Sequence, residues 1–262
     1  MERLARISCH HRAMVLLEAL LAGGFIGSVL GFVGAGGAMV SVPILLYIFH
    51  FTNQQATIAA LLIVGLAAAS GVIPKFKSKE VLVREAVSIW AIGLVATLSM
   101  TALANHINPK ILHSGFALVL IVAGASMLRG PINADPEHRM PIPVLILVSM
   151  IVGTLTGLFG IGGGFLAIPV LVLFYNTPQN KAAGTSLLII TMNCATSFFQ
   201  RYKSWHVVDW KTPFIIALVA IVISRLASQR SGKVNAKLLR RAFGYLLFTL
   251  SAFTILKTFF LQ

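Results

Sequence analysis

The feature that most constrains this chain is a series of apolar segments, each close to the length that a helix needs to cross a bilayer. A crossing takes about 20 residues, and about eight segments approach that length. They cover residues 13–33, 54–73, 85–104, 111–128, 142–159, 179–199, 212–226 and 241–261. Two shorter runs, residues 38–51 and 165–175, predict re-entrant segments, half-helices or steeply placed short helices. The pattern predicts an all-α polytopic membrane protein with about eight transmembrane helices and two such short segments.

Composition excludes the other broad classes of protein. Of the 262 residues, 57% are apolar and 11% are charged, against roughly a quarter charged in soluble domains. That leaves too little polar surface for a soluble globule, and far too much hydrophobicity for a disordered chain. The sequence contains no nucleophile–base pair or P-loop, and Cys9 and Cys194 have no metal-ligand spacing. We therefore expect no enzymatic activity, no cofactor and no metal site.

The charge balance indicates what the protein contacts. There are 21 Lys and Arg residues against 7 Asp and Glu, a net charge of +14. The basic residues cluster in short connectors between apolar segments, which is typical of multi-pass proteins of the cell inner (plasma) membrane and suits anionic lipids rather than nucleic acid. A cation or metal permease needs carboxylates in its membrane path, and here the acidic residues lie at segment ends or in connectors. The composition therefore favours an anionic or neutral substrate.

The chain reads as two copies of one unit. With a shift of 126 residues, the Gly, Gly-Gly and Pro positions of residues 27–43 fall on those of residues 153–169. We divide the chain into a first membrane repeat (1–128), a polar linker (129–141) and a second membrane repeat (142–262). If the two short runs are re-entrant, the repeats are parallel, and if they cross, the repeats are inverted. The basic residues do not distinguish these cases, and the oligomeric state, for which a homodimer is one option, also stays open.

Two glycine clusters are the strongest candidates for a binding site. Each follows an apolar helix and precedes a short apolar run, and the chain is expected to unwind there because Gly disfavours helix. Unwound backbone at membrane depth must line a cavity or be buried in protein, and the half-helix that follows would aim its N-terminal N–H groups at an anion. Close helix packing is the alternative role of these glycines. The candidate residues are Gly34, Gly36, Gly37 and Ala38 in the first cluster, and Gly160, Gly162, Gly163 and Gly164 in the second.

Polar residues of the following apolar segment extend this candidate site. Thr185, Ser186 and Asn193 interrupt an otherwise apolar run, and Ser186 and Asn193 share a helical face because they are seven residues apart. Interhelical hydrogen bonding is the structural alternative for the two hydroxyls. Lys75 and Arg201 occupy matching positions after their helices. They would attract an anion as paired vestibule charges, or else simply fix membrane orientation.

The doubled G-x-G-G…P pattern, the segment Ala182-Ala-Gly-Thr-Ser-Leu187 and Asp209-Trp210 resemble the sulfite exporter TauE/SafE family, also called the TSUP permeases. This resemblance implies a carrier of about eight crossings that arose by duplication, with sulfite, sulfonates or related organic anions as substrates. The clusters at Gly34–Gly37 and Gly160–Gly164 and the triplet Gly184–Ser186 match the family's motifs. The first repeat has Ile58-Ala59-Ala60 in place of the second triplet and lacks the Asp-Trp pair.

These observations favour a secondary transporter of small sulfur-containing anions that works by alternating access around a Gly-loop anion site. A cation or transition-metal permease, a carrier of non-sulfur organic anions, and a membrane-embedded enzyme or scaffold are the alternatives. Direction of transport, coupling ion and membrane orientation are open.

Overall fold

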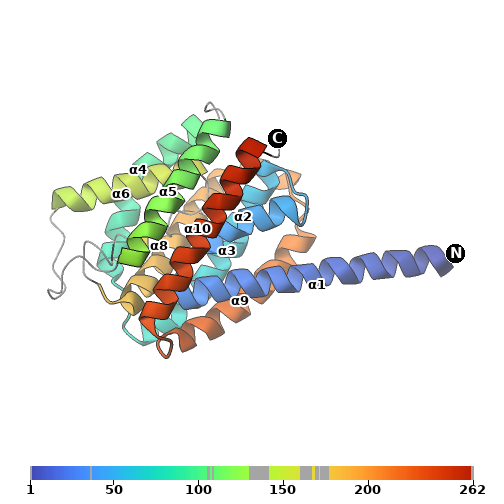
Figure 1. Cartoon of the computed structure of the whole chain (residues 1–262), viewed down its shortest axis with the longest axis horizontal. Helices are drawn as coiled ribbons and strands as arrows, with labels where there is room; N and C mark the ends of the chain where they lie inside the picture. Colours follow the sequence, from blue (N-terminus) through green and yellow to red (C-terminus); the bar gives the residue numbers. More distant parts are fainter. Residues whose placement is uncertain are drawn as a thin grey trace.

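The computed structural model describes residues 2–35, 37–104, 107, 109–129, 142–159, 167–168, 171 and 177–260. This part of the chain folds into helices without a strand, as expected (Figure 1). The elements are α1 (Glu2–Val33), α2 (Gly37–Tyr47), α3 (Asn53–Lys77), α4 (Val83–Ala104), α5 (Pro109–Arg129), α6 (Ile142–Phe159), α8 (Gln179–Gln200), η1 (Tyr202–Val207), α9 (Lys211–Ser231) and α10 (Ala236–Phe260).

Six of these helices are long and apolar enough to cross a membrane. These six are α1, α3, α4, α8, α9 and α10. The helices α5 and α6 contain the shorter apolar stretches Ser114–Leu128 and Leu145–Leu158. The predicted count of about eight crossings therefore stays a prediction. Residues 38–47 of the first short run lie in α2. Most of the second short run, like most of the predicted linker, lies outside the described residues.

Two helices form the centre of the bundle. Buried residues make up 67% of the apolar span of α3 and 61% of that of α8, against 39% or less in the other four spans. The remaining helices therefore shield α3 and α8 from the surroundings. The first of these central helices begins with a capping box: the Thr52 hydroxyl accepts a hydrogen bond from the Gln55 N–H, and the Gln55 side chain accepts one from the Thr52 N–H.

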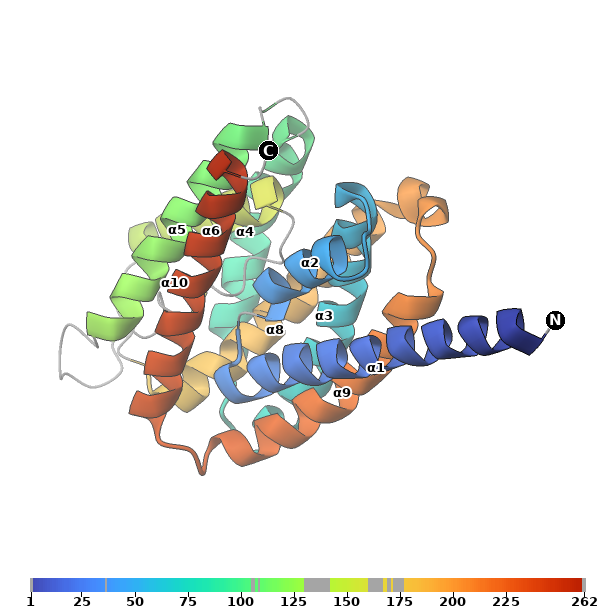
Figure 2. The ribbon, with the colours of Figure 1, turned by 45° about the vertical axis from the view of Figure 1, so that its right-hand side comes forward.

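Small residues allow the outer helices to pack closely. Gly23, Gly27 and Gly31 of α1 lie against α9, so close that a Cβ atom at Gly27 would come within 2.8 Å of the Ala220 carbonyl oxygen. In the other half of the chain, Gly153 and Gly157 of α6 pack in the same way against α4. Within each of the pairs α1–α9 and α4–α6, the two helices lie side by side (Figures 1 and 2). Small residues every four positions are typical of close packing between membrane helices.

The two helices at the centre run in opposite directions. Along their contact, Gly65 of α3 faces Cys194 of α8, Gly71 faces Leu187, and Lys75 faces Gly184. The pair α5–α10 is also antiparallel, because the Ser251 hydroxyl of α10 bonds the Ala117 carbonyl of α5 while Leu128 of α5 packs on Gly244.

The helix α2 brings the chain back between two helices that point the same way. Both α1 and α3 run in the direction of α9, since their contacts with it advance together along the two helices. The return is made by the 11 residues of α2 and the five that follow. At 1.5 Å per residue, α2 spans about 16 Å, roughly half of a hydrocarbon core.

Candidate functional site

The first glycine cluster breaks the helix as expected. The helix α1 ends at Val33 and α2 begins at Gly37. Between them Gly34 has a φ of +77°, a left-handed conformation that is costly for any residue with a Cβ. Its N–H still donates to the Leu30 carbonyl at 2.8 Å, which closes the end of α1. Gly36 lies outside the described residues, and Ala38 is in the first turn of α2.

This break rests directly on the central helix of the other half of the chain. A Cβ atom at Gly34 would lie 2.5 Å from the Cα and Cβ atoms of Ala183 in α8. Ala183 immediately precedes the Gly184-Thr185-Ser186 triplet. The fold therefore brings together two motifs that the sequence marks as candidates but separates by about 150 residues. Gly37 packs on the side chain of Leu30, so close packing and helix breaking occur in the same cluster.

The hydroxyl group of Thr185 has a structural role. It accepts a hydrogen bond from the Leu82 N–H at 3.0 Å and donates one to the Lys181 carbonyl at 2.8 Å. Beside it, Gly184 lies against the Glu80 carbonyl group, where no side chain would fit. Both residues thus hold the segment between α3 and α4, which is the structural alternative considered for Thr185.

The other two polar candidates on α8 are buried in the centre of the bundle. The Ser186 side chain is fully buried and Asn193 is 5% exposed, and each has an interaction within the protein. The break at Gly34 lies nearest to the Ser186 end of this pair, through Ala183. Gly160, Gly162, Gly163 and Gly164 lie outside the described residues, so the predicted second half of the site stays a prediction.

Lys75 and Arg201 do not form one paired vestibule. Because α3 and α8 are antiparallel, the ends of these helices lie on opposite sides of the bundle, which corrects the expectation from their matching sequence positions. Lys75 is 2% exposed, and its Nζ atom forms an ion pair of 2.7 Å with Glu80 Oε2. Arg201 has a buried Nε atom without a hydrogen-bond partner among the described residues, and desolvation lowers the pKa of its guanidinium group from the usual value. It remains a cation, because the pKa of arginine starts so high.

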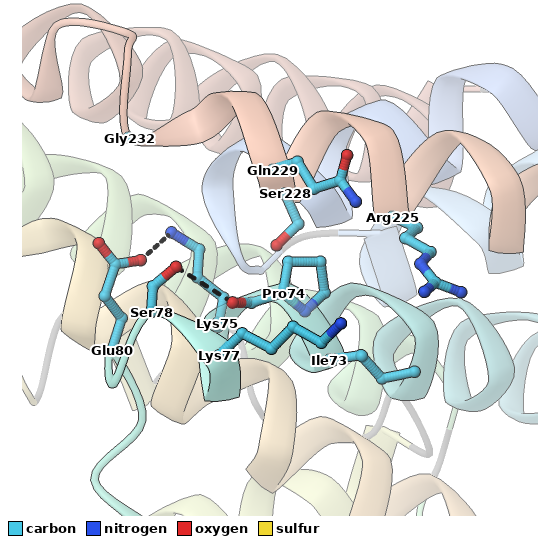
Figure 3. Close-up of a pocket in the computed structure, with 10 residues that line it drawn as sticks. All are labelled: Ile73, Pro74, Lys75, Lys77, Ser78, Glu80, Arg225, Ser228, Gln229 and Gly232. Carbon is cyan, nitrogen blue, oxygen red and sulfur yellow. Dashed lines mark hydrogen bonds and ion pairs between the residues drawn. The ribbon is translucent and has the colours of Figure 1, made fainter.

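A cavity of about 280 Å³ opens beside Lys75, between the last turns of α3 and α9 (Figure 3). From the sequence, Lys75 was either a vestibule charge or a residue that fixes membrane orientation, and nothing in the sequence placed α3 beside α9. The available signal was the carboxylate of Glu80, five residues after Lys75 and close to where α3 ends. Among the residues that the structure covers, no group of three His, Cys, Asp or Glu side chains is placed to hold a metal ion.

Comparisons with known proteins agree with the sequence motifs. The model of the family described as sulfite exporter TauE/SafE matches residues 19–254. A probable membrane transporter protein of Xylella fastidiosa (strain 9a5c) is 28% identical over 249 residues, 92% of this chain and 95% of the relative. The probable membrane transporter protein YunE of Bacillus subtilis (strain 168) is 25% identical over 232 residues, 79% of this chain and 83% of the relative. A probable membrane transporter protein of Methanocaldococcus jannaschii is 33% identical over 122 residues, 44% of this chain and 45% of the relative.

Proposed function

Because this chain belongs to the sulfite exporter TauE/SafE family, and is thus a multi-pass membrane transporter, we propose that it carries small sulfur-containing anions such as sulfite or organosulfonates across the cell inner membrane. It does so as a secondary transporter, by alternating access around a site at the glycine breaks. The proposed transport involves neither an enzymatic reaction nor ATP hydrolysis.

The observation that carries the proposal is the contact between the Gly34 break and α8. An interrupted helix inside a membrane protein exposes peptide N–H groups that need a partner, and a small oxyanion is a suitable one. Here the interruption lies in the buried centre, next to Ala183 and within reach of the Ser186 end of α8. Backbone N–H groups and neutral polar side chains can hold an anion without a fixed cation.

Alternating access is supported by the directions of the helices. The pairs α3–α8 and α5–α10 occupy matching places in the two sequence repeats, and each pair packs antiparallel. Repeats related in this way would be inverted relative to each other. Inversion requires an odd number of membrane passages in each repeat, and α2 would then count as one of these passages. Inverted repeats with a site at their interface can rock around that site and open it to either side in turn.

The proposal favours an anion over a metal cation on the basis of the buried charge. Within the described ranges, Lys75 is the charged side chain that is almost fully buried, and a cation path would need carboxylates in its place. A carrier of non-sulfur organic anions shares this chemistry, and the choice of substrates in the experiment distinguishes the two.

The test is a flux assay in proteoliposomes with labelled sulfite, a sulfonate, a carboxylate and a divalent metal ion. We expect the wild-type chain to carry sulfite or the sulfonate. Gly34→Ala should abolish this flux, because it adds roughly 1–2 kcal/mol of backbone strain and a clash with Ala183. Gly24→Ala is the matched control, since a Cβ at Gly24 of α1 meets nothing within 4 Å.

The purified variants must elute as monodisperse protein, so that loss of flux is separated from loss of fold. If the chain carries the carboxylate but neither sulfite nor the sulfonate, its substrates are carboxylates and not sulfur-containing anions. If it carries the metal ion, its substrate is a cation and not an anion. If folded Gly34→Ala transports as fast as Gly24→Ala, the break is not part of the site.

A further inference from the structure

The cavity at the ends of α3 and α9 combines room with positive charge. Its volume of about 280 Å³ is far more than the ~15 Å³ that a single water molecule requires. Three cations line it, Lys75, Lys77 and Arg225, against the single carboxylate of Glu80. The hydroxyl groups of Ser78 and Ser228 lie on its wall (Figure 3). This excess of positive charge around a partly buried cavity attracts small anions.

Among the described residues, the ion pair that neutralises Lys75 is the one with Glu80. Lys75 is 2% exposed while the Glu80 side chain is 25% exposed, so the cation is the buried partner and the carboxylate reaches toward water. A buried cation that loses its partner is strongly unfavourable. Another anion that reached Lys75 from the cavity would satisfy the same charge, and Glu80 would then be free to leave.

Glu80 also connects the cavity to the candidate site on α8. Its carbonyl group packs on Gly184, and two residues further along the Leu82 N–H bonds the Thr185 hydroxyl. We call residues 78–82, which join α3 to α4, the latch segment. In this structure backbone N–H groups of residues 78–80 bond carbonyl groups of the last turn of α3, and the Glu80 side chain at the middle of the latch segment pairs with Lys75. The far end of the latch segment is held by Thr185, next to Ala183 where the Gly34 break rests.

We propose that this cavity is a loading site for the transported oxyanion, and that the anion opens the latch segment by replacing Glu80 at Lys75. Lys77 and Arg225 attract the anion, Lys75 receives it, and release of Glu80 frees the latch segment from α8. This inference rests on the proposed function and adds a second anion site to it.

Among the described residues, the equivalent positions of the second repeat do not reproduce this arrangement. With the 126-residue shift, Lys75 and Glu80 correspond to Arg201 and His206. The second pair lacks a carboxylate, and the Nε atom of Arg201 has no hydrogen-bond partner in the described part of the chain. Anion-controlled opening is therefore expected from one side of the membrane.

The first experiment measures sulfite flux against sulfite concentration in vesicles of zwitterionic lipid. The double variant Lys77→Gln/Arg225→Gln should raise KM at least about tenfold, because even one charge contact of this kind is worth about that factor, and it should leave the maximal rate close to that of the wild type. Arg230→Gln/Lys233→Gln is the matched control, because it also removes one arginine and one lysine. It removes the same charge from exposed residues nearby that do not line the cavity, and its KM should not change.

The second experiment measures hydrogen exchange of the peptide that contains the Leu82 amide. Sulfite at a concentration near the wild-type KM should speed this exchange several-fold in the wild type and in the control, and should have much less effect in Lys77→Gln/Arg225→Gln, whose KM is higher. In Glu80→Gln the exchange should be fast without sulfite, because the neutral amide no longer pairs with Lys75.

Equal KM values in the two double variants would overturn the loading site while leaving the proposed function intact. A raised KM without any change in exchange would overturn the latch. If vesicles containing phosphatidylglycerol speed the exchange without sulfite, the occupant is a lipid headgroup and the assignment is wrong. A wild-type chain that carries neither sulfite nor the sulfonate overturns the proposed function instead, and the exchange experiment still tests the cavity because it requires binding alone.

Discussion

Thr185 illustrates how the surroundings of a single residue decide its role. A threonine in an apolar helix can bond its own backbone, a neighbouring helix or a ligand. Thr191 bonds the backbone of its own helix, since its hydroxyl donates to the Leu187 carbonyl at 2.8 Å. Thr185 makes the equivalent bond and also accepts the Leu82 N–H from the segment after α3. The two residues differ only in what packs against them.

This difference predicts unequal effects of the same substitution. Thr185→Val leaves the buried Leu82 N–H without an acceptor and should lower the free energy of unfolding by about 1–3 kcal/mol. Thr191→Val loses only a bond to a carbonyl that keeps its helical partner, and should cost under about 0.5 kcal/mol. Unfolding in detergent, followed by circular dichroism, measures both. Equal stabilities would show that the bond between Leu82 and Thr185 contributes nothing.

At the scale of single residues, the sequence indicates which residues can break a helix or carry charge, but not which partners they contact. The break at Gly34 was predictable because glycines disfavour helix at that spacing, and its positive φ agrees. The burial of Lys75 was not predictable. In the sequence its partner Glu80 has the features of an ordinary connector residue, and the burial depends on how α3 and α9 pack.

Among the helices, the contact between α1 and α9 depends on a run of glycines. Gly23, Gly27 and Gly31 recur every four residues on one face of α1. A Cβ at Gly27 or Gly31 would overlap backbone or side-chain atoms of α9. Such contact lets the backbones approach closely and gains packing attraction that lipid cannot supply.

A larger residue at this contact should force the two helices apart. We expect Gly27→Leu to destabilise the protein by about 1–3 kcal/mol, the usual cost of overpacking, or to prevent folding. Gly24→Leu lies on the open face of α1, where nothing is within 4 Å of the added Cβ, and should be tolerated. Expression as monodisperse protein and the midpoint of thermal unfolding report the outcome. Similar midpoints for the two variants would refute the close contact.

For the molecule as a whole, the central question is how its two halves are oriented. The basic residues in the connectors allow either a parallel or an inverted arrangement. The contacts of α3 with α8 favour the inverted arrangement, since Gly65 faces Cys194 while Lys75 faces Gly184. The C-terminal ends of these two helices therefore point away from each other.

This orientation predicts labelling from opposite sides of the membrane. Lys77 and Lys203 follow matching positions of the repeats and both are exposed. In a chain with Cys9→Ser and Cys194→Ser, we expect Lys77→Cys and Lys203→Cys to react with a membrane-impermeant thiol reagent from opposite faces. Right-side-out and inside-out vesicles measure this directly. Reaction of both from one face would mean that the halves are parallel.

The sequence alone determined that this chain forms apolar helices, where most of them begin and end, and where α1 breaks, because local composition and glycine spacing dictate these features. The helix directions, the burial of Lys75 against Glu80 and the cavity beside Arg225 depend on residues far apart in the chain. Only the tertiary structure decides such features. A side chain's partners follow from which helices pack together, and apolar helices of similar composition leave that choice open until small residues such as Gly27 and Gly153 select the contacts.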